Sequence, residues 1–235
     1  MKRFLLIGIV SATGLALLLV YLLFNGYIRF NYPDRNEFPI IGIDISHHQG
    51  EIRWGELHTE NISFVMVKAT EGGDFKDPLF NINWKESKAA GYKTGAYHFY
   101  RICKDGKEQA KNFLETVPVE PDNLPPTIDL EFGGNCKTDK TQEQIIEEIN
   151  EFLSILEGHY KKRPIIYATH EFYDQFLIGK FTDHPIWIRD IFKRPTLRDG
   201  RDWLIWQFAN RGHVNGIDGY VDLNVINGQS MELLK

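Results

Sequence analysis

The segment PPTIDLEF, residues 125–132, is an apolar run that carries two acids, Asp129 and Glu131, separated by one leucine. Short runs rich in β-branched and aromatic residues after a turn signal are typical of β-strands. Because side chains alternate along a strand, Asp129 and Glu131 share one face, whereas Ile128 and Leu130 share the other. The apolar face can pack under helices, so the two acids are expected to point into the interior of the fold.

Similar apolar runs recur along the chain and are separated by helical patterns. Strands are predicted over residues 40–45, 64–69, 94–100, 127–131, 165–168, 186–189 and 204–208, with a further strand near Val221. Crossover helices are predicted around residues 80–90, 107–116 and 141–160. The last of these begins with a capping box made by Thr141 and Gln144.

The order of these elements decides the fold class. Repeated strand, helix, strand order predicts a parallel sheet whose strands are buried on both faces. About eight such strands favour a closed barrel over an open sheet, and the helical patterns thin out after Leu177. We therefore predict an α/β fold, namely a modified TIM-like barrel of eight strands with about five crossover helices.

The N-terminal residues have a different composition from the rest of the chain. Lys2 and Arg3 precede 21 residues without a charge, residues 4–24. As a helix this run would be roughly 31 Å long, enough to cross a bilayer. No small-x-small cleavage site follows it, so we favour an uncleaved anchor over a removed signal peptide.

This pattern predicts three parts: a transmembrane signal-anchor over residues 1–30, a linker over residues 31–38 and one barrel domain over residues 39–235. The basic residues before the span predict a cytoplasmic N-terminus and a barrel outside the cytoplasmic membrane.

Bulk composition excludes some functions and leaves others open. The 235 residues are 43% hydrophobic and 25% charged, which is ordinary for a globular protein. A net charge of −5 argues against nucleic-acid partners, which normally leave a basic footprint. Two cysteines, Cys103 and Cys136, fit neither a four-ligand zinc site nor a CxxC pair; they can form a disulfide in an oxidising compartment or remain free thiols.

Two further acids follow apolar strands, Asp44 in GIDIS and Asp222 in YVDLN. Barrel enzymes carry their chemistry at the C-terminal ends of the strands. Two carboxyls held close in a cavity of low dielectric do not both ionise easily, so one keeps a proton near neutrality. Such a pair can cleave a glycosidic bond. Acids paired with Lys or Arg, a metal site, or a loop cap made by a lone Asp are the alternatives.

The segments GIDISHHQG, FVMVKATEGG, GAYHFYR, PPTIDLEF, PIIYAT, PIWIRD and WQFANRGHVNGIDGYVDLN occur in this order. In this the chain resembles glycoside hydrolase family 25, the Chalaropsis-type lysozymes, over nearly the whole part after the linker. The resemblance implies cleavage of the β-1,4 bond between N-acetylmuramic acid and N-acetylglucosamine in peptidoglycan. By matching positions it implies Glu131 as the general acid, with Asp129, Asp44 and Asp222 as further catalytic acids and Tyr167 as an active-site tyrosine.

Two mechanisms remain open from the sequence. In the preferred one, Glu131 protonates the leaving oxygen, the N-acetyl group of the substrate attacks the anomeric carbon and Asp129 stabilises the developing charge, with net retention. In the other, Asp44 or Asp222 activates water from the opposite face, with inversion.

Sugar rings also stack on aromatic side chains. Candidate substrate contacts are Tyr97, Tyr100, Tyr167, Trp187 and Trp206, although large aromatics in strands commonly belong to the core. His47 and His48, with His98 and His213, raise the alternative of a metal hydrolase, but adjacent histidines rarely bind one ion and no HxxxH or HxH spacing occurs. We therefore predict no metal and no cofactor.

The sequence predicts a membrane-anchored muramidase of the cell envelope, with its catalytic domain extracytoplasmic and peptidoglycan glycan strands as its partner. A cell-wall-binding module that lost turnover is one alternative. A chitinase-like hydrolase is another, although the longer acidic strand motif expected of such an enzyme is missing.

Overall fold

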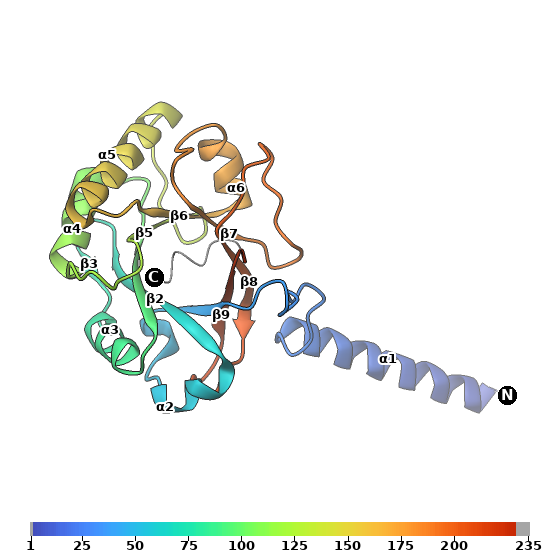
Figure 1. The fold of residues 1–235 in the computed structure, drawn as a ribbon. Helices are drawn as coiled ribbons and strands as arrows, with labels where there is room; N and C mark the ends of the chain where they lie inside the picture. Colours follow the sequence, from blue (N-terminus) through green and yellow to red (C-terminus); the bar gives the residue numbers. More distant parts are fainter. Residues whose placement is uncertain (1, 229–235) are drawn as a thin grey trace.

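Eight strands close into a barrel in the computed structural model, which describes residues 2–228 (Figure 1). Strand β1 pairs with β2 on one side and with β9 on the other, and these two pairings close the sheet. The barrel strands are β1 (Ile41–Ile45), β2 (Ile62–Glu71), β4 (Lys93–Phe99), β5 (Thr127–Leu130), β6 (Ile165–Thr169), β7 (Ile186–Arg189), β8 (Ile205–Gly212) and β9 (Val221–Ile226). The predicted barrel of eight strands is therefore confirmed.

Strand direction departs from the prediction at one place. Neighbouring strands from β1 through β8 run parallel, but β9 runs antiparallel to both β8 and β1. Only residues 213–220 separate β8 from β9, and a parallel connection needs a crossover of a dozen or more residues. The short strand β3 (Phe75–Lys76) folds back on the end of β2 as a hairpin.

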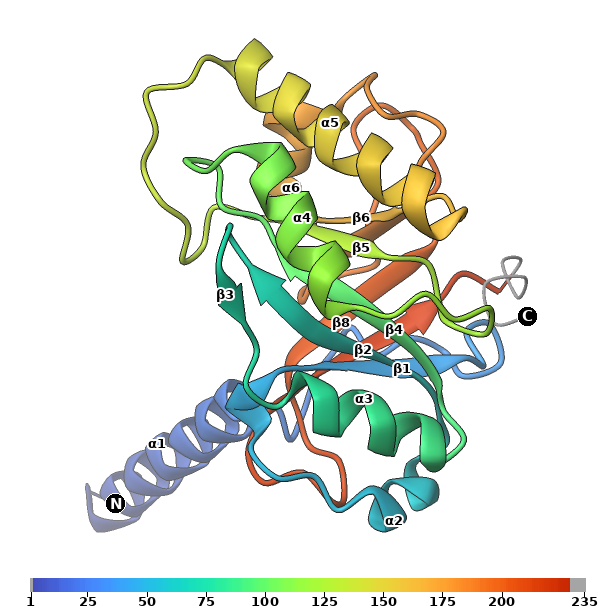
Figure 2. The same cartoon turned by 90° about the vertical axis from the view of Figure 1, so that its left-hand side faces the viewer.

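Helices cover the outside of the barrel (Figure 2). They are α2 (Trp54–Leu57), α3 (Phe80–Ala89), α4 (Gly106–Thr116), α5 (Gln142–Tyr160) and α6 (His170–Phe172), the last followed by a π-helical turn over Tyr173–Leu177. The capping box is present, because Thr141 Oγ1 accepts from the backbone N–H of Gln144 while Gln144 Oε1 accepts from that of Thr141. Between residues 178 and 228 the structure has no helix, as predicted.

The core has two parts. The larger part fills the space between the strands and the surrounding helices and includes Ile128 and Leu130. A smaller apolar group fills the barrel interior below the acids; its members include Phe64, Met66 and Trp187. Phe64 enters the barrel only because residue 42 is glycine, since a Cβ at Gly42 would lie 2.3 Å from the Phe64 ring.

The N-terminal helix α1 (Lys2–Phe24) extends away from the barrel (Figures 1 and 2). Among the helices of the described residues, none combines the length and hydropathy required to cross a bilayer, so the membrane anchor predicted within residues 1–30 is not supported. Residues 31–38, predicted as a linker, contact the barrel: Asn31 Nδ2 donates to the Phe208 carbonyl at 2.8 Å, and Phe38, 2% exposed, packs on Trp203.

Candidate active site

The four acids singled out from the sequence line one cavity of about 340 Å³ at the C-terminal ends of the parallel strands. Asp44 lies on β1 and Asp129 on β5, whereas Glu131 follows the last residue of β5. Asp222 lies at the start of β9, and because β9 runs antiparallel this start meets the same rim.

Asp129, on β5, and Glu131, just past its end, both line the cavity. Burial raises the pKa of both carboxyls, and for Asp129 the charge of Glu131 raises it further. Both effects favour a protonated carboxyl in this pair. Asp129 Oδ1 is buried and has no hydrogen-bond partner among residues 2–228, so this oxygen is available to a ligand in the cavity.

Unlike Asp129, Asp44 has hydrogen-bond donors around its carboxylate. Its Oδ2 accepts from Asn224 Nδ2 at 2.7 Å and from Gln207 Nε2 at 3.1 Å. Asp222 lies directly opposite it in the β1 and β9 register. Burial raises the pKa of both acids, and the hydrogen bond between them lowers that of Asp44 and raises that of Asp222. This interaction therefore favours the charged form of Asp44 and the protonated form of Asp222.

Two aromatic side chains fix the amides that bind Asp44. Tyr167 Oη donates to Gln207 Oε1 at 2.9 Å, and Trp187 Nε1 donates to Asn224 Oδ1 at 2.8 Å. With each amide oxygen occupied, each amide nitrogen faces Asp44. Gln207 and Asn224 were not predicted from the sequence, although Asn224 lies two residues after Asp222 and thus on the same face of its strand.

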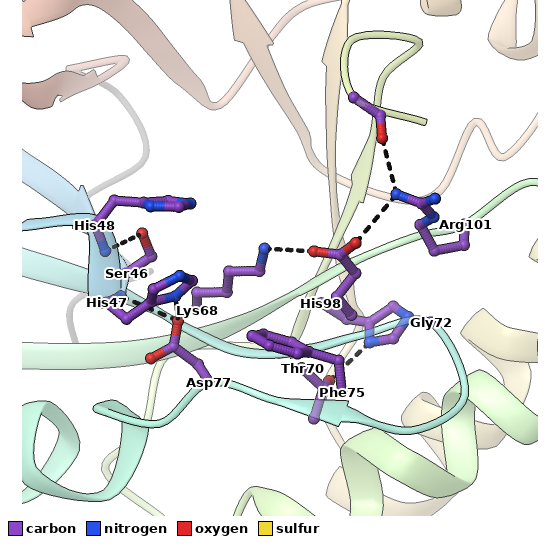
Figure 3. Close-up of polar contacts among 12 residues, drawn as sticks. Ser46, His47, His48, Lys68, Thr70, Gly72, Phe75, Asp77, His98 and Arg101 are labelled. Carbon is purple, nitrogen blue, oxygen red and sulfur yellow. Dashed lines mark hydrogen bonds and ion pairs between the residues drawn. The ribbon is translucent and has the colours of Figure 1, made fainter. Parts of the chain in front are cut away.

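A cation also lines the cavity. Lys68 is 8% exposed, and its Nζ contacts Glu71 Oε2 at 2.8 Å (Figure 3). The same nitrogen lies 5.1 Å from the ring centre of Phe99. Arg101 binds the other oxygen of Glu71 at 3.1 Å and the Gly134 carbonyl at 2.8 Å. The charge of Lys68 lowers the pKa of Asp129 and of Glu131 against the effect of burial. The sequence signal for Lys68 was a lysine inside the apolar run FVMVKAT.

The histidines weighed as metal ligands lie in separate surroundings. His47 Nδ1 donates to Asp77 Oδ2 at 2.7 Å, whereas His48 lines the cavity, and burial lowers its pKa. His98 is fully buried between Thr70 and Gln109, and burial lowers its pKa to about 3, so it is neutral (Figure 3). His213 binds the Asn25 carbonyl outside the barrel.

The aromatic candidates divide into two groups. Tyr97, Tyr167 and Trp187 line the cavity. Tyr100 does not, because it follows the end of β4 and packs against Phe152. Trp206 also lies in the outer core, where its Nε1 donates to the Asp190 carbonyl at 2.8 Å, so the expectation that these two residues reach the cavity is corrected.

A disulfide joins Cys103 to Cys136, which resolves the choice between paired and free thiols. It links the segment after β4 to the segment after β5. Asn135 connects the same two segments, because its Nδ2 donates to the carbonyls of Tyr100 and Glu131, both at 2.8 Å, and its Oδ1 accepts from the Ile102 N–H at 3.0 Å. The backbone on either side of the cavity wall is thus fixed beside Glu131.

Comparison with known proteins agrees with this arrangement. The sequence model of the family "Glycosyl hydrolases family 25" matches residues 43–217 of this chain. The structure of a family 25 glycosyl hydrolase from Bacillus anthracis superposes with a TM-score of 0.81 at 37% identity, covering 88% of this chain and 96% of that one. A bacterial lysozyme from Streptomyces coelicolor gives a TM-score of 0.75 at 30% identity, covering 83% and 95%.

Among sequence relatives, Lysozyme M1 from Streptomyces globisporus is 33% identical over 205 residues, which is 82% of this chain and 69% of the relative. The family match spans most of the barrel, from β1 to the segment before β9. Sequence, fold and the acid-lined cavity agree. The chain therefore belongs to glycosyl hydrolase family 25 and is a glycoside hydrolase.

Proposed function

We propose that this protein is a lysozyme that hydrolyses the β-1,4 bond between N-acetylmuramic acid and N-acetylglucosamine in peptidoglycan. Relatives in its family carry the names lysozyme and muramidase. The observation that carries the proposal is the pair formed by Asp129 and Glu131, whose pKa values are raised by burial inside a cavity lined by two further acids.

Glu131 acts as the general acid. It is the less buried member of the pair, next to Gly133 and Gly134, and so it is the one placed to meet the glycosidic oxygen. As its proton passes to that oxygen, the bond from the oxygen to the anomeric carbon breaks and the leaving sugar departs as an alcohol.

Asp129 acts on the 2-acetamido group of the sugar. Its unpartnered Oδ1 accepts the amide N–H, which directs the acetamido carbonyl oxygen to form a bond with the anomeric carbon. Water, deprotonated by the Glu131 carboxylate, then attacks the same carbon and opens the oxazolinium ring. The configuration is retained and Glu131 recovers its proton.

An inverting route uses one acid to activate water from the opposite face. Of the two further acids, Asp44 fits the role of base better, because the hydrogen bond between them lowers its pKa and raises that of Asp222. Proton NMR of the first-formed anomer distinguishes the routes. A β-anomer is expected, and an α-anomer as the first product would exclude assistance by the acetamido group.

Muropeptide mass spectrometry tests the bond and the general acid together. The wild-type protein is expected to release fragments with reducing-end muramic acid from purified peptidoglycan. Glu131→Gln should be slower by about 10²–10⁴-fold, because it cannot donate the proton. Glu171→Gln, an exposed glutamate on α6, is the matched control and should behave as wild type.

Other outcomes of the same assay oppose the proposal. Reducing-end glucosamine would show a different bond. Faster cleavage of chitin oligomers than of peptidoglycan would favour a chitinase-like enzyme. Sedimentation with peptidoglycan but no released fragment, from wild type and Glu131→Gln alike, would favour a wall-binding module.

The proposed substrate places the action of the enzyme outside the cytoplasm, at the cell envelope. The disulfide between Cys103 and Cys136 supports this, because such bonds persist in oxidising compartments. Alkylation of intact cells without reduction should leave both cysteines unlabelled. Carbonate washing of membranes from the same cells measures whether the N-terminal segment retains the protein there, as the sequence of residues 1–30 predicts.

A further inference from the structure

The segment that follows α1 is docked on the hairpin formed by β8 and β9. The guanidinium of Arg211 lies 3.9 Å from the ring centre of Phe24, and its Nη1 donates to the Phe24 carbonyl at 2.5 Å. His213 Nε2 donates to the Asn25 carbonyl at 2.8 Å, and its ring stacks on Tyr27 at 4.5 Å with the planes 7° apart. We call residues 24–27 the N-terminal clasp.

Asn25 and Gly26 shape the clasp. Asn25 Nδ2 donates to the Tyr21 carbonyl at 2.8 Å, while its Oδ1 accepts from Tyr220 Oη at 2.6 Å, so one side chain joins the end of α1 to the barrel. Gly26, at φ +77°, ends the helix in a left-handed turn. A Cβ there would lie 2.1 Å from the Arg211 carbonyl oxygen, so only glycine allows this close approach.

The clasp connects to the cavity through Tyr220. The Tyr220 carbonyl accepts from Gln49 Nε2 at 3.1 Å, and Gln49 lines the cavity. Gln49 Oε1 in turn accepts from the Ser46 N–H at 2.8 Å, which fixes the turn that follows Asp44. Tyr220 also lies two residues before Asp222, so the backbone that it holds carries a catalytic acid into the site.

Tyr220 is the last residue of the turn before β9. Residues 213–220 include buried Val214 and Ile217, which fix the side of the turn away from Tyr220. The ion pair from Arg53 to Asp218 is exposed, and exposed pairs contribute little. The Tyr220 side chain contacts Asn25, Arg211 and the His213 ring, and its carbonyl binds Gln49, whereas Val221 and Asp222 after it are paired with β8 and β1.

We propose that the N-terminal clasp positions the rim of the substrate cavity: by binding Tyr220 it holds the entry to β9, and with it Asp222, in the arrangement opposite Asp44. The end of α1 accordingly helps to position residues of the active site. The structural part of this proposal is independent of the substrate, whereas its catalytic part rests on the proposed function.

Two substitutions in the full-length chain test the docking by hydrogen exchange of residues 213–222. Tyr220→Phe removes only the hydroxyl bound to Asn25, and Asn25→Ala removes its partner. Each should speed exchange of these amides by roughly 5–10-fold, as expected when a local closing contact is lost. Tyr21→Phe, an exposed tyrosine on α1, is the matched control and should leave exchange unchanged.

The double variant shows whether Asn25 and Tyr220 act through their shared hydrogen bond or independently of each other. If the clasp acts as one unit, Asn25→Ala with Tyr220→Phe should equal either single variant, because residues in one hydrogen bond are not additive. On soluble glycan fragments, kcat should fall about threefold or more with KM within about twofold, since the positioning of Asp222 acts on the reaction and not on binding.

Two results would overturn the proposal: unchanged exchange at residues 213–222 in both single variants, or effects that add in the double variant. A wild-type protein without lysozyme activity would instead refute the proposed function and leave the exchange result to decide the docking. Gly26→Ala should disrupt the docking of the clasp more strongly, because its Cβ would clash with the Arg211 carbonyl. If hydrogen exchange and kcat of this variant equal those of the wild type, the proposal is also contradicted.

Discussion

Asp44 and Asp129 show how partners divide the roles of two chemically identical residues. Both are less than one-tenth exposed in the same cavity. Asp44 accepts from the amides of Gln207 and Asn224, and these donors lower its pKa against the larger effect of burial. Asp129 has an unpartnered oxygen and faces the charge of Glu131, which favours its neutral form or the binding of a donor from a ligand. One aspartate is therefore held by donors of the protein, and the other has an oxygen open to a ligand.

Lys68 is expected to set the pH range of activity. Its charge lowers the pKa of Asp129 and of Glu131, so Lys68→Met should raise both values and shift the whole pH profile of kcat/KM to higher pH. The control is Lys76→Met, an exposed lysine on β3 outside the cavity. An unmoved profile, or one shifted to lower pH, would show that Lys68 does not act on the acids.

The site was predictable where polar residues interrupt an apolar strand in a pattern that only a cavity explains. Asp129 and Glu131 meet this condition. Trp206 and Trp187 do not, because strands buried on both faces give no alternation that separates inside from outside. Gln207 and Asn224 could not be predicted for a similar reason. The sequence around a buried amide does not tell whether the amide binds other core groups or an acid of the cavity such as Asp44.

Among the elements, the disulfide holds the segments after β4 and β5 beside Glu131, the proposed general acid. It closes a sequence separation of 33 residues, for which chain entropy predicts a loss of about 3–4 kcal/mol when it is removed. Cys103→Ser with Cys136→Ser should therefore lower the midpoint of thermal unfolding and reduce kcat, because Glu131 and Gly134 lose a fixed neighbour.

Calorimetry and steady-state kinetics measure these two effects separately. Reduction of the wild-type protein is the matched treatment and should reproduce the double variant. If stability falls while kcat stays at the wild-type value, Asn135 alone suffices to hold this wall of the cavity.

The elements themselves were predictable to within a few residues because each strand is a short apolar run bounded by turn signals. The end of β4 illustrates the limit: the predicted strand reached Tyr100 but the observed one ends at Phe99, and past that end alternation no longer tells which way Tyr100 points. The direction of β9 was missed although the connection of residues 213–220 was too short for a parallel crossover.

At the scale of the molecule, the acid cluster is a cost to stability that depends on pH. Burial raises the folded-state pKa of Asp129 above its unfolded value, so its contribution favours folding below the unfolded pKa and is lost as pH rises through the folded pKa. Asp129→Asn removes this loss. The variant should gain thermal stability relative to wild type at pH 8, by about 2–4 °C for each kcal/mol, with a much smaller gain at pH 4.

Asp218→Asn is the control, because the pKa of Asp218 is shifted in the opposite direction from that of Asp129. Arg53 lowers the pKa of Asp218, so this carboxylate favours folding above its unfolded pKa, and its removal should bring no gain that grows with pH. Scanning calorimetry of the three proteins from pH 4 to pH 8 measures the differences. A constant gain for Asp129→Asn across that range would trace its effect to packing, and the cavity acids would then carry no pH-dependent cost to the fold.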